Sequence, residues 1–176
     1  MLTEREEKYC ATIAERIERM RVLLNERTLG NPESPSTWYE FLSALRQIQG
    51  NSSNALSFVA TLLAKRYLEE RFPCSFDAAK KPQGAPGIDI DLRTLEGDRV
   101  IGEIKTTVPY LAADFGAQQA ASFKKDFDKL RLTIAEHKFL FVTEQSAFSV
   151  LKKPNYTKHI PGIRIVLLTT GEDHIA

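Results

Sequence analysis

The stretch PGIDIDLRTLEGDRVIGEIKTT, residues 86–107, places four charged side chains inside runs that otherwise read as buried strands: Asp89, Asp91, Glu103 and Lys105. Aspartate is a poor strand residue. A buried charge is costly unless it is paired or binds a metal. We therefore expect these side chains either to line a solvent-filled cleft or to hold an ion.

Apolar and charged residues alternate along the first of the two runs, over residues 88–93. Successive side chains of a strand point to opposite faces. The apolar set is therefore expected to face a core, with Asp89 and Asp91 on the other side. On the second run, Glu103 and Lys105 are two residues apart and share a face by the same rule.

The loop between the two strands decides which acids meet. A two-residue turn would put the acids on opposite faces. The three-residue loop 95–97 has Gly97 at its third position, where a common hairpin needs a left-handed residue that forms a G1 bulge. This register places Asp89 opposite Glu103. A loop one residue later would place Asp91 there instead, so Asp91 stays the alternative to the favoured Asp89.

Two carboxylates side by side repel each other, and a hard divalent cation removes that cost. Asp89, Glu103 and the backbone carbonyl of Ile104 are the candidate ligands. Mg²⁺ usually takes one or two carboxylates and leaves its other positions to water and phosphate oxygens. Lys105 would orient the attacking water or stabilise charge that develops on a phosphate. This residue set suits phosphodiester hydrolysis.

The order of Pro86-Gly-Ile-Asp89, a hairpin and Glu103-Ile-Lys105 resembles the PD-(D/E)xK superfamily, the restriction-endonuclease-like nucleases. The resemblance implies that Asp89 and Glu103 bind Mg²⁺, with Mn²⁺ as a possible substitute, and that Lys105 assists hydrolysis. The family core is a helix, a three-stranded meander, a helix and a strand. Many members also carry a glutamate on the first core helix, for which Glu69 and Glu70 are available here.

The rest of the chain can supply that core. Residues 1–54 are predicted to form a helical region of the same globular unit as a nuclease core over 55–176. The predicted fold is mixed α/β (α+β), with a central sheet flanked by helices. Apolar periodicity and the turn residues predict the following elements: helices over 3–27, 38–49, 55–71 and 117–136, the hairpin, and strands over 138–142 and 163–169.

Overall charge does not indicate nucleic-acid binding, because 24 Lys and Arg stand against 23 Asp and Glu in 176 residues. Any basic surface must be local. The candidates for weak DNA contacts are five lysines: Lys124, Lys125, Lys152, Lys153 and Lys158. The charged N-terminus shows no secretory signal and no apolar run reaches the length of a membrane span. We expect a cytoplasmic protein with Cys10 and Cys74 reduced.

The resemblance implies a Mg²⁺-dependent DNA endonuclease, and the short chain favours a sequence-specific type II restriction enzyme. No phosphate loop of the GxxxxGK[ST] type occurs, so no nucleotide cofactor is expected. Cutting both strands of a palindrome in double-stranded DNA favours a homodimer. Two alternatives remain: a structure-selective or repair nuclease of the same fold, and a non-catalytic DNA-binding or interaction domain with a nuclease-like fold.

Overall fold

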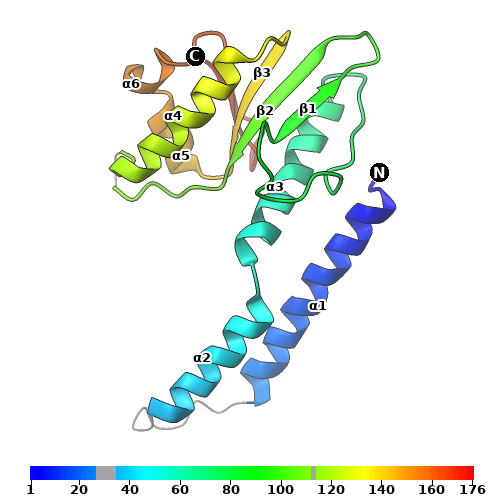
Figure 1. Cartoon of the computed structure of the whole chain (residues 1–176), viewed down its shortest axis with the longest axis vertical. Coiled ribbons are helices and arrows are strands. Elements are labelled where there is room, and N and C mark those ends of the chain that lie inside the picture. Colours follow the sequence, from blue (N-terminus) through cyan, green and yellow to red (C-terminus); the bar gives the residue numbers. More distant parts are fainter. Residues whose placement is uncertain (27–34, 112–113) are drawn as a thin grey trace. The chain divides into compact units, whose positions relative to one another are not determined.

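The computed structural model describes residues 1–26, 35–111 and 114–176 (Figure 1). The chain divides into two compact units, Met1–Ala55 and Leu56–Ala176. Each unit is described by itself below. Across the described residues, no helix is both long enough and apolar enough to cross a lipid bilayer. Cys10 and Cys74 are both free thiols.

The first unit contains two helices, α1 (Glu4–Glu26) and α2 (Pro35–Gln49). A capping box starts α1. The Glu6 amide donates to Thr3 Oγ1 at 3.2 Å, and the Thr3 amide donates to Glu6 Oε2 at 2.8 Å. Two otherwise unpaired donors of the first turn are thereby satisfied. Pro35 is the first residue of α2, a position that needs no amide donor.

The second unit is built on a mixed five-stranded sheet with strand order β1-β2-β3-β4-β5. The outer pairs β1–β2 and β4–β5 are antiparallel, and β2, β3 and β4 run parallel. The predicted mixed α/β class is confirmed. The strands are β1 (Ile90–Arg93), β2 (Arg99–Lys105), β3 (His137–Val142), β4 (Arg164–Leu167) and β5 (Asp173–Ile175). The helices are α3 (Ser52–Glu69), α4 (Ala117–Leu132), α5 (Gln145–Leu151) and α6 (Pro154–Thr157).

Both faces of the sheet are covered, with α3 on one side and α4 and α5 on the other (Figure 1). This explains why consecutive residues in the middle of the sheet are buried rather than alternating with polar ones. The α3 side packs Ala60, Ala64, Tyr67 and Leu68 against Ile90, Val100, Phe139 and Phe141. The other side packs Phe123, Phe127, Leu130 and Phe148 against Ile101, Leu140, Val142 and Ile165.

The β1–β2 hairpin has the register that the position of its glycine predicts. Ile90 pairs with Gly102 across the two strands. The amide of Thr94 donates to the carbonyl of Asp98 at 2.9 Å, which closes the three-residue loop. Gly97 in that loop has a φ of +99°, a conformation that favours glycine. The loop therefore sets which side chains of β1 and β2 lie opposite each other.

The structure differs from the predicted elements at three places. The helix predicted over 117–136 ends at Leu132, because Thr133 adopts an extended conformation. Ile134, predicted to lie in the buried stripe, is 87% exposed. Between α3 and α4 the described residues form two strands and one isolated bridge, where the family core has a three-stranded meander. Two short helices, α5 and α6, and the strand β5 follow β3 and were not predicted.

Candidate functional site

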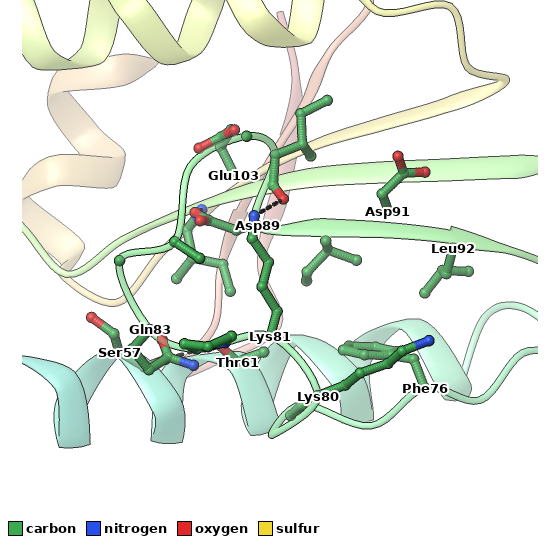
Figure 2. Close-up of a pocket in the computed structure, with 18 of the residues that line it drawn as sticks. Ser57, Thr61, Phe76, Lys80, Lys81, Gln83, Asp89, Asp91, Leu92 and Glu103 are labelled. Carbon is green, nitrogen blue, oxygen red and sulfur yellow. Dashed lines mark hydrogen bonds between the residues drawn. The ribbon is translucent and has the colours of Figure 1, made fainter.

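A groove with a volume of about 1190 Å³ lies between α3, the segment 75–88 and the β1–β2 hairpin (Figure 2). α3 contributes Ser57 and Thr61 to its lining, and the segment contributes Lys80 and Lys81. Five charged residues that lie close together also line it: Asp89, Glu103, Lys105, Asp126 and Lys129. These five side chains are called the charged cluster below.

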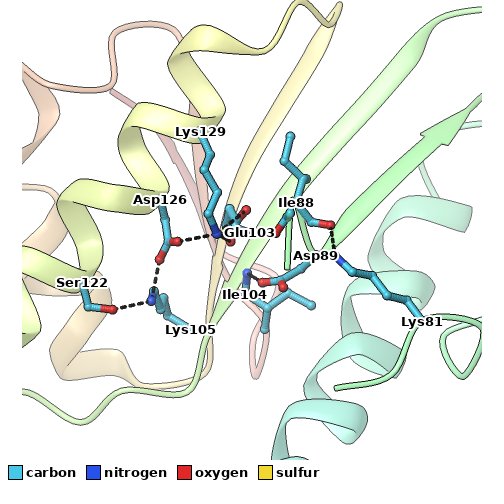
Figure 3. A network of polar contacts seen from close by, with 10 residues as sticks. Lys81, Ile88, Asp89, Glu103, Ile104, Lys105, Ser122, Asp126 and Lys129 are labelled. Atoms are coloured by element: carbon cyan, nitrogen blue, oxygen red, sulfur yellow. Dashed lines mark hydrogen bonds and ion pairs between the residues drawn. The ribbon is translucent and has the colours of Figure 1, made fainter. Parts of the chain in front are cut away.

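Asp89 is the exposed member of the charged cluster and directly precedes β1 (Figure 3). Its Oδ2 accepts a hydrogen bond from the amide of Ile104 at 2.9 Å, which fixes the carboxylate beside β2. On its other side, Lys81 Nζ donates to the carbonyl of Ile88 at 2.6 Å. Gly87, with a φ of +95°, allows the turn that leads into this position. Asp89 is thus held from both neighbouring segments.

Glu103 lies in the middle of β2 and is only 2% exposed. Both of its carboxylate oxygens lie 3.2 Å from Lys129 Nζ. Burial raises the pKa of Glu103, and the charges of Asp89 and Asp126 raise it further, to about 8, although Lys129 acts in the opposite direction. Two carboxylates that crowd one buried site cannot both be ionised cheaply. The charged cluster therefore favours an additional proton or cation.

Lys105 lies two residues after Glu103 and on the same side of β2, as the alternation rule predicts. Its Nζ lies 2.5 Å from Asp126 Oδ2 in an ion pair and donates to Ser122 Oγ at 2.9 Å. It also lies 5.5 Å from the centroid of the Phe123 ring. Three side chains of α4 therefore hold the ammonium group beside the two acids.

Asp126 and Lys129 belong to the charged cluster but were missed by the sequence reasoning. Both come from α4, where Lys129 Nζ donates to Asp126 Oδ1 at 2.9 Å. Burial lowers the pKa of Lys129, but the hydrogen bond with Asp126 and the charge of Glu103 outweigh this and raise it. One signal was present in the sequence. Asp126 stands between Phe123 and Leu130 at helical spacing, which puts a charge on the buried stripe of α4.

The alternative ligand, Asp91, makes a different contact. Its two oxygens accept from Arg99 Nε at 2.9 Å and from Arg99 Nη2 at 2.7 Å. The hydrogen bond to this guanidinium group holds the pKa of Asp91 below its usual value. Glu69 and Glu70, the candidates on the first core helix, are not part of the groove lining among the described residues. The structure thus brings Asp89, rather than Asp91, next to Glu103.

The five lysines predicted to contact DNA do not line the groove, as far as the described residues show. Lys152 forms an ion pair with Glu172 at 3.3 Å and lies over the Phe148 ring. The other four are exposed on α4 and around α6: Lys124, Lys125, Lys153 and Lys158. The cations nearest to the acids are instead Lys105, Lys129 and Lys81.

The donor set fits a hard divalent cation. In the parts of the chain that the structure describes, no three His, Cys, Asp or Glu side chains form a ready metal site. Mg²⁺ does not require one, because it binds through one or two carboxylates and keeps several waters. Asp89, Glu103 and the Ile104 carbonyl supply that number of oxygens. A cation there would also relieve the repulsion that raises the pKa of Glu103.

Comparisons with protein-family models, curated proteins and solved structures found no match for this chain. The interpretation of the site therefore rests on its own residues. Two carboxylates that can hold a cation, next to a fixed ammonium group in an open groove, form an arrangement able to bind and polarise a phosphate.

Proposed function

We propose that the chain is a Mg²⁺-dependent DNA endonuclease that hydrolyses phosphodiester bonds. One observation carries the proposal: Asp89 is hydrogen-bonded to the residue after Glu103, and Lys105 lies on the same side of β2. These are the three positions that match the PD-(D/E)xK pattern. Their register follows from the Gly97 loop rather than from the motif letters.

The order of elements supports a restriction-endonuclease-like core. α3 precedes the antiparallel β1–β2 hairpin, and α4 then leads to β3, which pairs in parallel with β2. This order agrees with the helix, meander, helix and strand of the family, apart from the third meander strand. The site lies in the second unit, whose residues form the sheet.

Each residue of the site has a distinct role in the proposal. Asp89, Glu103 and the Ile104 carbonyl hold the cation, which supplies charge neutralisation at the phosphate and makes water more acidic. Lys105 orients the attacking water or stabilises the negative charge that develops on the phosphate. Asp126 holds the Lys105 ammonium in place through their 2.5 Å ion pair. Lys80 and Lys81, which line the groove, neutralise neighbouring phosphates of the strand.

We favour a sequence-specific type II restriction enzyme that acts as a homodimer on double-stranded DNA. The argument is the short chain without a phosphate loop, together with the two-fold symmetry that cutting a palindrome on both strands requires. A structure-selective or repair nuclease would use the same cluster on a different substrate. A non-catalytic domain would keep the fold without turnover.

Incubation of the purified protein with plasmid and phage DNA, with Mg²⁺ or EDTA, tests the proposal. We expect discrete Mg²⁺-dependent bands that disappear in Asp89→Asn and in Lys105→Ala. Asp91→Asn is the matched control, because it removes the same charge two residues away and should still cut. A smear would indicate a nonspecific nuclease, and preference for flaps or junctions a repair enzyme. No cleavage together with no heat of Mg²⁺ binding would overturn the proposal.

A further inference from the structure

An ammonium group already occupies the charged cluster in this structure. Lys129 Nζ lies 3.2 Å from both oxygens of Glu103, 2.9 Å from Asp126 Oδ1 and 3.5 Å from the carbonyl oxygen of Gly87. These four oxygens come from β2, from α4 and from the turn that leads to Asp89 (Figure 3). Oxygens of this kind are also the ligands that a hard divalent cation prefers.

We propose that Lys129 is a tethered cation that a divalent metal ion must displace from Glu103 before it can bind. The inference rests on the proposed metal site and adds a residue that controls its occupancy. Both Glu103 oxygens face the same ammonium group, so a metal ion and Lys129 cannot share this carboxylate without strong repulsion between like charges.

The surroundings of Lys129 permit the displacement. The Lys129 side chain is 39% exposed, whereas those of Glu103 and Asp126 are 3% and 7% exposed. A long, partly solvated lysine stem can carry its head group into water at small cost. Asp126 lies three residues earlier on the same helix and can keep its hydrogen bond with the ammonium group after Glu103 is released. Only one of the two carboxylates has to be given up.

This arrangement has two consequences. In the metal-free protein the buried Glu103 carboxylate is compensated by the chain itself, so the site does not depend on metal to remain folded. The same compensation weakens metal binding, because the ion pair with Lys129 must be broken first. Removing the ammonium group should therefore tighten metal binding, whereas removing a catalytic or structural lysine has no reason to do so.

Titration with Mn²⁺, followed by electron paramagnetic resonance of free Mn²⁺ and by calorimetry, tests the inference on the full chain. We expect Lys129→Met to bind Mn²⁺ at least tenfold more tightly than the wild type. Lys129→Arg keeps the charge and should not bind more tightly. Arg131→Met is the matched control, because it removes a positive charge from the same helix where the side chain is exposed and paired with Asp128. Its affinity should equal that of the wild type.

A second measurement uses the unmodified protein. In nuclear magnetic resonance spectra, addition of Mg²⁺ should speed the exchange of the Lys129 ammonium protons with water, because the group leaves Glu103. Unchanged exchange at saturating Mg²⁺ would overturn the inference even if Lys129→Met failed to fold.

The outcomes separate this inference from the nuclease proposal. Equal or weaker Mn²⁺ binding by Lys129→Met would overturn the inference and leave the metal site in place. Binding by Lys129→Met alone, without binding by the wild type, would support it. Binding by neither protein would overturn both the inference and metal-dependent hydrolysis. Tighter binding by the variant without any DNA cleavage would support the inference and refute the nuclease.

Discussion

The pKa of Glu103 makes the stability of the sheet depend on pH. In the unfolded chain this side chain titrates near its ordinary value of 4.5, and in the folded protein burial and the neighbouring acids raise its pKa to about 8. Between these values the folded protein keeps a proton that the unfolded chain releases. Raising the pH through this range therefore favours unfolding. The contribution of Glu103 is most favourable below pH 4.5 and is lost progressively until about pH 8.

The size of the effect follows from the difference between the two pKa values. A difference of about 3.5 corresponds to up to about 5 kcal/mol at about 1.4 kcal/mol per pKa unit. Glu103 is almost fully buried, so solvent screens this effect little. Glu103→Gln cannot ionise and keeps a similar shape. We expect the free energy of unfolding of the wild type to fall by several kcal/mol, relative to this variant, between pH 5 and pH 8.

Urea denaturation at pH 5, 6, 7 and 8 without divalent metal provides the measurement. The single tryptophan, Trp38, lies in α2 and would report on the first unit rather than on the sheet. Hydrogen exchange of the β2 and β3 amides reports on the sheet directly. The comparison of wild type with Glu103→Gln cancels the titration of the histidines and of the other acids.

Parallel pH profiles for the two proteins would refute this reasoning. They would mean that Glu103 is ionised throughout the range and that Lys129 compensates its charge completely. A wild type that gains stability with rising pH, relative to the variant, would reverse the assignment: the pKa of Glu103 would then be lowered by Lys129 rather than raised by burial.

Three further substitutions test the packing around the site. Gly102→Ala would put a Cβ 2.8 Å from the Phe141 ring, so we expect a loss of about 1–3 kcal/mol in urea denaturation; no loss would mean that the ring moves aside freely. Gly97→Ala places a side chain at a φ of +99° and should lower stability by about 1 kcal/mol, whereas Gly97→Asn should cost less. Tyr67→Phe removes a 2.9 Å hydrogen bond to Asp173 and should cost about 1 kcal/mol, and spectrophotometric titration should lose a phenol of pKa about 12.

Local rules were enough to predict the hairpin from the sequence. The alternation over 88–93 assigned the two faces of β1, and the position of Gly97 selected one register out of three. Thr3 and Glu6 likewise specified the capping box that starts α1. Each of these features depends on residues a few positions apart, where side-chain direction and allowed backbone angles leave few choices.

The partners of the charged residues could not be read in the same way. Asp91 appeared equivalent to Asp89 until the structure placed Arg99 beside it. Helical periodicity gave α4 its buried stripe, but it did not indicate that Asp126 and Lys129 meet residues of β2 more than 20 positions earlier. It also did not locate the end of α4 at Leu132.

The sequence alone thus determined the mixed α/β class, the hairpin register and the pairing of Asp89 with Glu103, because backbone geometry within a few residues imposes them. Only the tertiary structure decided which cations surround those acids. The rotation and position of α4 on the sheet depend on how Phe123 and Phe127 pack against β2 and β3. Such packing sums many weak contacts between distant segments, and the periodicity of either segment does not specify it.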